Sequence, residues 1–288
     1  MKIAIVIDSS SGLTEKQANS IGWHYLPIQI EIDGVTYEDG VSVDYSTVFK
    51  HIKQDSKVLT SASKLGYAIE MINKLKETHD LVVFYPICIK LSSQYQNIKV
   101  AFQDDEKVFI VPSEGLQAMI VLQLLEFEER IKNGVPFEKA IEIFSTHKCD
   151  VMLMPANTDA LLRGGRLSPA AASMAKLLKI VPIIKLEHGG LEKYGKGRVF
   201  EKTILKVAKE IQEKNQNKRI VVLHADNKNV NNYAKQIQEY TETDEPFITT
   251  IAPCISVHTG KDAISVVTEY GEKLIEKYLD KLKEIKSR

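Results

Sequence analysis

Short apolar runs that alternate with amphipathic stretches dominate the first half of the chain. The clearest run, Leu81–Tyr85, has the length and the β-branched and aromatic content of a buried strand. The stretch from Gln94 to Asp105 follows with helical spacing, and Val100 is among the residues expected to face inward. A longer helical pattern covers Glu114 to Asn133. This alternation is typical of a mostly parallel α/β domain, which we expect over residues 1–148.

Polar residues mark where several of these helices are expected to begin. Asp44 has the position of an N-cap for a helix over residues 45–54. Ser61 or Ser63 has the same position before a helix that ends at Lys76. Their side-chain oxygens can accept hydrogen bonds from the free N–H groups of a first helical turn.

The second half of the chain repeats the alternation of strands and helices. A short buried strand is predicted at Val151 to Pro155, and Ser168 is expected to open an Ala-rich helix that continues to Leu178. Residues 254–262 are expected to form a loop. A second α/β domain is therefore predicted over residues 149–288.

Hydroxyl-rich segments follow several predicted strands of the first half. They are Asp8 to Gly12, Thr60 to Ser63, Ser92-Ser93 and the segment around Ser113. In an open α/β sheet, the loops beyond the carboxyl ends of the strands converge on one crevice. Helix N-termini in such a place leave N–H groups unpaired and carry partial positive charge, which suits a small anion. We therefore expect one polar pocket, which the rest of the chain builds and covers.

Length, charge and cysteine content narrow the class of protein. At 288 residues two domains are the natural expectation, and 38 basic residues balance 38 acidic ones, so no net field recruits nucleic acid. Cys88, Cys149 and Cys254 are widely spaced and odd in number, which favours reduced thiols over a disulfide framework or a zinc site. A strand is predicted directly after Met1, and no apolar run approaches the ~20 residues of a bilayer span. We expect a soluble cytoplasmic protein without a signal peptide.

Nucleophilic catalysis is one interpretation of the polar residues. Ser92 and His258, with Asp8 as a third member, could act as a catalytic set in a Ser-dependent hydrolase of lipid or acyl esters. The sequence around Ser92 is not the G-x-S-x-G elbow that such an enzyme usually needs. In the simpler alternative, Ser92 caps a helix and His258 lies in a loop.

Phosphoryl transfer and metal chemistry have little support in the sequence. A P-loop and a G-x-G-x-x-G segment after the first strand are both missing, and the seven histidines form no i, i+4 pair. We expect neither a metal nor a cofactor.

Binding without catalysis needs fewer features. Hydroxyl groups of Thr60, Ser61 and Ser92, together with one histidine, could hold a carboxylate through hydrogen bonds worth roughly 1.5–3 kcal/mol each. An apolar tail attached to the carboxylate could supply the rest of the binding free energy. Burial of about sixteen methylene groups of such a tail would contribute on the order of 12 kcal/mol, from which the costs of ordering the tail and of association are subtracted. An α/β module that binds another small carboxylate is a further alternative.

Apolar residues of the second half could line a tail of this kind, although most such residues are simply core. The candidates are Met152, Met154, Met174, Leu177, Leu178, Ile180, Ile183 and Ile184.

Five motifs, taken in order, resemble the DegV family of bacterial fatty-acid-binding proteins. They are Asp8-Ser9-Ser10 with Gly12-Leu13, Thr60-Ser61, Leu91-Ser92 with Tyr95-Gln96, the segment Leu162 to Ser168, and His258-Thr259-Gly260. The resemblance implies a two-domain DegV-like fold, with a mostly parallel Rossmann-like sheet, a second α/β domain and one fatty acid buried between them. It implies a non-catalytic carrier that presents the acid to a separate fatty acid kinase, which makes acyl phosphate for phospholipid synthesis. Transient contact with a membrane surface is compatible with that role.

The resemblance also implies which residues hold the ligand. The carboxylate would contact Thr60, Ser61, Ser92 and His258. Candidates for a further head-group loop are Ser9, Ser93 and Ser113, and those for the acyl-chain lining are Met152, Met154, Met174, Leu178 and Ile184.

The chain departs from the family pattern near these residues. Ala62-Ser63-Lys64 follows Thr60-Ser61 where the family usually has Q-P-S, and Ser93-Gln94 replaces the usual G-T. Lys261-Asp262 replaces P-G after the histidine motif. The hydroxyls and the imidazole are retained, so we keep head-group binding as the prediction. A serine in place of glycine at position 93 could add a donor or force a different backbone angle.

Three arginines lie near these motifs. Arg163, Arg166 and Arg198 either pair with carboxylates and helix ends or help to dock the partner kinase.

Overall fold

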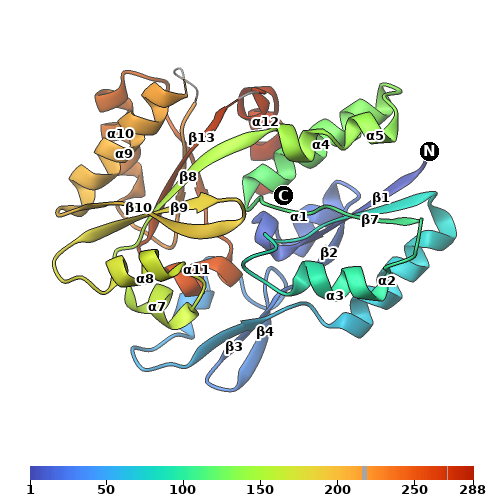
Figure 1. Cartoon of the computed structure of the whole chain (residues 1–288), viewed down its shortest axis with the longest axis horizontal. Coiled ribbons are helices and arrows are strands. Elements are labelled where there is room, and N and C mark those ends of the chain that lie inside the picture. The colour runs from blue at the N-terminus through green and yellow to red at the C-terminus, as the bar shows by residue number, and fades with distance from the viewer. Residues whose placement is uncertain (216–218, 271) are drawn as a thin grey trace. The chain divides into compact units, whose positions relative to one another are not determined.

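The computed structural model of the protein describes residues 1–215, 219–270 and 272–288 (Figure 1). Its contacts divide the chain into two compact units. Unit 1 comprises Met1–Val121, Ala252–Ile255 and Asp280–Arg288, and unit 2 comprises Leu122–Ile251 and Ser256–Leu279. Contacts alone do not test which segments fold independently, so the predicted domains 1–148 and 149–288 stay a prediction.

Unit 1 is built on a four-stranded sheet in which all neighbouring strands are parallel, in the order β2-β1-β6-β7. The strands are β1 (Ile3–Asp8), β2 (His24–Leu26), β6 (Leu81–Tyr85) and β7 (Val108–Ile110). Every residue of β6 is buried, as expected for an inner strand of a parallel sheet covered on both faces. The predicted parallel α/β architecture of the first half is confirmed.

Two helices contribute to the main core of this unit, α2 (Leu65–Thr78) and α3 (Gln94–Ala101). Their buried residues pack with those of the sheet in one cluster: Ala4, Val6, Leu26, Ala68, Ile72, Leu75, Val82, Phe84, Ile98 and Phe102. Helix α3 ends four residues before the predicted Asp105, and Val100 is 63% exposed. The prediction that Val100 faces inward was wrong, because Ile98 and Phe102 occupy the buried face of that turn.

A second, antiparallel sheet of unit 1 has the order β4-β3-β5. It contains β3 (Gln29–Ile32), β4 (Val35–Glu38) and β5 (Val58–Ser61). Thr60 and Ser61 are therefore the last residues of an antiparallel strand, and the expectation that they follow a strand of the parallel sheet was wrong.

Two predicted N-caps of unit 1 were also wrong. The Asp44 carboxylate accepts hydrogen bonds from the backbone and hydroxyl groups of Ser46, which form a turn, and only the short 3-10 helix η2 (Val48–Lys50) follows. Helix α2 has Lys64 at its N-cap position, without a side-chain hydrogen bond, and Ser63 bonds elsewhere. By contrast, Thr14 and Gln17 form a complete capping box that opens α1 (Glu15–Ser20).

Unit 2 is built on a six-stranded mixed sheet in the order β10-β9-β8-β13-β11-β12. The strands are β8 (Lys148–Met154), β9 (Val181–Glu187), β10 (Gly190–Gly197), β11 (Val221–His224), β12 (Phe247–Thr250) and β13 (Ile264–Tyr270). Within this sheet, β11 and β12 are the only neighbouring strands that pair in parallel among the described residues. The second unit is α/β, as predicted, but its sheet is largely antiparallel.

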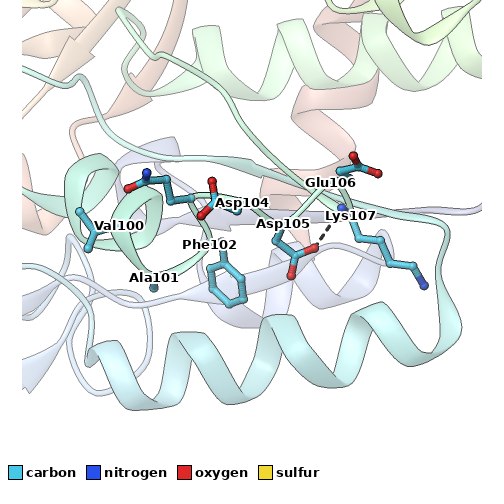
Figure 2. Close-up of a pocket in the computed structure, with 8 residues that line it drawn as sticks. Val100, Ala101, Phe102, Asp104, Asp105, Glu106 and Lys107 are labelled. Atoms are coloured by element: carbon cyan, nitrogen blue, oxygen red, sulfur yellow. Dashed lines mark hydrogen bonds between the residues drawn. The ribbon is translucent and has the colours of Figure 1, made fainter.

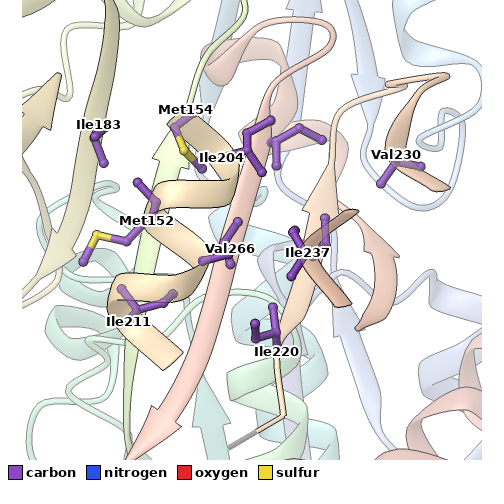
Figure 3. Close-up of a cluster of buried hydrophobic side chains, with 13 residues drawn as sticks. Met152, Met154, Ile183, Ile204, Ile211, Ile220, Val230, Ile237 and Val266 are labelled. Carbon is purple, nitrogen blue, oxygen red and sulfur yellow. The ribbon is translucent and has the colours of Figure 1, made fainter. Parts of the chain in front are cut away.

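Two helices of unit 2 contribute to the core on one face of this sheet, α9 (Phe200–Lys214) and α10 (Val230–Thr241). Figure 3 shows residues of both helices meeting residues of β8 and β13. The cluster contains Met152, Met154, Ile183, Ile204, Val207, Ala208, Ile211, Ile220, Val222, Val230, Ile237, Ile264 and Val266.

The remaining helices are mostly short. They are η1 (Ser9–Ser11), α4 (Ala118–Lys132), α5 (Phe137–Ala140), α6 (Ile143–Thr146), α7 (Asp159–Gly164), α8 (Pro169–Ala175), α11 (Pro253–Thr259) and α12 (Leu274–Ser287). Helix α11 occupies most of the segment predicted as a loop; Pro253 suits its first position, and Gly260 follows it with a φ of 85°. None of the described helices combines the length and the apolar composition that crossing a bilayer requires.

Candidate functional site

The loop after β1 is a buried polar structure. Both oxygens of the Asp8 carboxylate accept hydrogen bonds: Oδ1 from the backbone and hydroxyl of Ser10, and Oδ2 from the backbone N–H of Ile87 at 2.7 Å. Burial raises the pKa of Asp8 to about 6, although these donors oppose the shift. Asp8 thus joins the loops after β1 and β6, which confirms that loops at this edge of the parallel sheet come together.

Ser9 and Ser113 use their hydroxyl groups inside this scaffold. Ser9 Oγ accepts from the backbone N–H of Ile28 at 3.1 Å, and Ser113 Oγ accepts from the N–H of Gly115 at 3.1 Å. Both serines are 1% exposed. A structural role accounts for these contacts, and their role in a further head-group loop stays a prediction.

A second buried carboxylate lies beside this loop. Asp39 Oδ2 accepts from the backbone N–H of Cys254 at 2.9 Å, at the start of α11. Burial raises the pKa of Asp39 to about 7, and the nearby charge of Asp8 adds to the shift. The sequence analysis missed Asp39, because no motif distinguishes this carboxylate from the exposed ones around it.

Thr60 and Ser61 extend from β5 toward opposite faces of the antiparallel sheet, because successive strand residues alternate. Thr60 pairs with Ile30 and is half-buried, whereas Ser61 pairs with Gln29 and is exposed. The two side chains therefore lie on different sides of β5, and one small head group can contact both of them only at the end of this strand.

Ser92 lies in the loop that leads into α3, and its hydroxyl oxygen accepts from the backbone N–H of Gln94 at 3.2 Å. The Gln94 side chain in turn bonds to Ser63: Oε1 accepts from the Ser63 N–H at 2.9 Å, and Nε2 donates to Ser63 Oγ at 2.8 Å. This contact ties the segment after Thr60 and Ser61 to the Ser92 loop. Ser93 is exposed with a φ of −75°, so serine is accommodated there without backbone strain.

In unit 2, His258 lies in the last turn of α11, directly over Gly164. A Cβ atom at position 164 would lie 3.0 Å from His258 Nδ1, so the close contact depends on glycine. Gly165 turns the chain with a φ of 67°, and the guanidinium of Arg166 donates to the Gly164 carbonyl. Gly164 therefore allows the close approach of the imidazole, and Gly165 allows the left-handed turn that follows.

Electrostatics keep this imidazole neutral. Burial, and secondly the positive charge of Arg166, lower the pKa of His258 to about 4. A neutral imidazole has one N–H to donate, and can hold an anion without adding a second full charge.

The three arginines differ in environment. Arg166 is half-buried and structural, whereas Arg163 in the last turn of α7 and Arg198 before α9 are exposed. Partner docking by these arginines stays a prediction, and exposure makes Arg163 and Arg198 the better candidates.

The predicted acyl-chain lining is divided by the sheet of unit 2. Met152 and Met154 lie in the core cluster shown in Figure 3, and alternation along β9 places Ile184 on the face opposite Ile183 of that cluster. Met174 is buried on α8, which packs against β9 and β10.

The lining role of these four residues stays a prediction. Leu178 is 88% exposed, which disagrees with a place along a buried tail, because α8 ends at Ala175 and not at Leu178.

One surface hollow beside α3 has a volume of about 590 Å³ (Figure 2). Asp104, Asp105 and Glu106 line it, and Lys107 donates to Asp105 from its backbone N–H. None of the residues proposed to hold the head group lines this hollow. Among the described residues, no group of His, Cys, Asp and Glu side chains could hold a metal ion.

Comparisons with known proteins agree on one family. A family model described as an uncharacterised protein of the DegV family matches residues 2–270. A DegV domain-containing protein of Mycoplasmopsis pulmonis (strain UAB CTIP) is 43% identical over 273 residues, which cover 92% of this chain and 94% of that protein.

Two solved structures show the same fold. A fatty acid binding DegV family protein from Streptococcus agalactiae superimposes with a TM-score of 0.83 at 22% identity, covering 94% of this chain and 100% of that one. A DegV family protein from Thermus thermophilus, described by its fatty acid binding, gives a TM-score of 0.81 at 21% identity with the same coverage.

Proposed function

Because the chain belongs to the DegV family, we propose that it is a non-catalytic protein that binds one long-chain fatty acid. The observation that carries the proposal is the match, over 94% of the chain, to the fold of proteins named for fatty acid binding. The proposed contacts of the carboxylate are Thr60, Ser61, Ser92 and His258.

The local chemistry of these residues supports the proposal. Ser92 Oγ already accepts from Gln94 N–H, which leaves its hydroxyl proton for an acid oxygen. His258 is uncharged at neutral pH and lies near the guanidinium of Arg166. Neutral donors beside a positive charge stabilise a carboxylate through charge-assisted hydrogen bonds.

The same observations disfavour the hydrolase alternative. A catalytic triad requires a carboxylate that orients the histidine, but the oxygens of Asp8 are bonded to Ser10 and Ile87. A pKa of about 4 also makes His258 a weak base at neutral pH.

Denaturing mass spectrometry of the purified protein tests the binding function directly. We expect a co-purified long-chain acid, and displacement of a fluorescent fatty acid by added palmitate or oleate with micromolar or tighter affinity. Absence of a bound acid together with no uptake of either acid would overturn the proposal.

We further propose that the bound acid is presented to a separate fatty acid kinase for acyl-phosphate formation. The exposed Arg198 is a candidate docking residue. Arg198→Glu is expected to slow phosphorylation of the bound acid at least tenfold while palmitate retention is unchanged. Lys235→Glu, a charge reversal at another exposed site on α10, serves as the control. Equal phosphorylation rates for wild type and the Arg198 variant would remove this docking role.

A further inference from the structure

The side chains of Gln94 and Ser63 form a reciprocal contact that we name the Gln94–Ser63 clamp. Oε1 of Gln94 accepts from the Ser63 backbone N–H at 2.9 Å, and Nε2 donates to Ser63 Oγ at 2.8 Å. Gln94 is 1% exposed and Ser63 is 6% exposed. Each group of the amide has one partner of the right kind, so a flipped amide would set Nε2 against the Ser63 N–H.

The clamp joins the two segments of unit 1 that carry the proposed head-group hydroxyls. Ser63 lies two residues after Ser61, the last residue of β5, and Gln94 donates to Ser92 Oγ from its own backbone N–H at 3.2 Å. One residue thus contacts both segments, with its side chain on one and its main chain on the other.

The helices that follow the two segments begin without side-chain caps. The N-cap residues Lys64 of α2 and Ser93 of α3 make no side-chain capping hydrogen bond. The amide of Gln94 replaces this capping with a bond between two different loops. A buried amide that lost these partners would leave polar atoms unpaired, so the arrangement is a strong constraint on loop position.

We propose that Gln94 is a positioning residue, which sets the spacing between Ser92 and the Thr60–Ser61 strand end and thereby the strength of carboxylate binding. This inference rests on the proposed fatty-acid-binding function. In this role Gln94 acts through its bonds to Ser63 and to Ser92 Oγ.

A comparison of palmitate with methyl palmitate tests the inference, because the two differ only at the head group. The measured quantity is the ratio of the Kd for the ester to the Kd for the acid, obtained by displacement of a fluorescent fatty acid. Gln94→Ala is expected to lower this ratio about tenfold. Misplaced hydroxyl groups would weaken the affinity for the carboxylate of the acid and would leave the contacts of the tail, which both ligands share, unchanged. A purely structural role would weaken both ligands equally.

Matched variants keep the outcome interpretable. Gln96→Ala changes an exposed glutamine of the same helix and should leave the ratio unchanged, as should Ser63→Thr, which retains the hydroxyl group. Ser63→Ala removes only the acceptor of Nε2 and should lower the ratio by a smaller factor, which provides a test if the Gln94 variant does not fold.

A wild-type ratio in both Gln94→Ala and Ser63→Ala would overturn the positioning role and leave the binding function intact. No preference for the acid in the wild-type protein would instead contradict the proposed function itself.

Discussion

The two regions that carry the proposed head-group contacts are held in place by different means. In unit 1, side-chain hydrogen bonds from Asp8, Gln94 and Ser63 fix loops that carry hydroxyl groups. In unit 2, the lack of a side chain at Gly164 leaves room for the His258 imidazole, and burial together with the charge of Arg166 lowers its pKa. An isosteric side chain can keep a hydrogen bond, whereas any side chain at position 164 must displace the imidazole, so the two regions should respond differently to mutation.

The regions also differ in how their charge responds to pH. Burial raises the pKa values of Asp8 and Asp39 in unit 1, so their neutral forms are favoured in the folded state. Burial and Arg166 lower the pKa of His258 in unit 2, where the neutral form is again favoured. Unit 1 should therefore lose stability as pH rises, and the His258 region should lose it as pH falls.

The largest effect is expected from Asp39→Asn. The folded pKa of Asp39 is about 7, against 3.8 for an unperturbed aspartate, so its contribution to stability is complete below pH ~4 and is lost as pH rises through 7. The variant should raise the free energy of unfolding at pH 8 by a few kcal/mol, and by no more than about 4. Its gain at pH 5 should be smaller. Urea denaturation at the two pH values measures both.

Asp55→Asn, at an exposed position, is the control for this experiment and should have little effect at either pH. If the Asp39 variant were less stable than wild type at pH 8, the folded state would need the charged carboxylate. That result would contradict the expectation that unit 1 favours the neutral form of Asp39.

A smaller effect is expected from Gly164→Val. Its Cβ would lie 3.0 Å from His258 Nδ1, and the added methyl groups would displace the imidazole. We expect about 1–3 kcal/mol lower unfolding free energy, with a roughly tenfold loss of palmitate affinity if His258 holds the acid. Denaturant unfolding and ligand displacement measure the two effects.

Gly66→Ala is the matched control, because position 66 lies in α2 with open space around it and should gain roughly 0.5–1 kcal/mol. Unchanged stability and binding in the Gly164 variant would mean that neither depends on the close contact between Gly164 and His258.

The smallest effect is expected from His258→Gln. The His258 pKa of about 4 lies below the 6.5 of an unperturbed histidine, so its contribution to stability is present above pH ~6.5 and is lost as pH falls through 4. The variant should shift the midpoint of acid unfolding to lower pH by a few tenths, as followed by circular dichroism. His188→Gln, at an exposed histidine, should leave the midpoint in place. A shift to higher pH would contradict the assigned direction.

Much of the fold could be predicted from local patterns. The strands β1 and β6 are almost entirely apolar runs, and Thr14 and Ser168 cap helices as their side chains suggest. The DegV resemblance, which rests on five short motifs, is confirmed by the family match over residues 2–270.

The errors arose where a polar side chain had a choice of partners. Asp44 forms a turn and no helix cap, and Ser63 bonds to Gln94 in place of its own helix. Local propensity treats both outcomes alike, because each satisfies a free N–H group with a side-chain oxygen. The segment before Gly260 was predicted as a loop because its helix, α11, is only seven residues long.

The sequence by itself determined which residues are apolar strands, which segments carry hydroxyls and an imidazole, and which family the chain belongs to, because these depend on residue type and local order. Only the tertiary structure decided that Gln94 bonds to Ser63, that Asp39 accepts a hydrogen bond from the start of α11 and that Gly164 lies against His258. Each of these contacts joins residues far apart in the sequence, and burial gives them their energies and pKa shifts. The residues next to a side chain in the sequence predict neither its tertiary partner nor its burial.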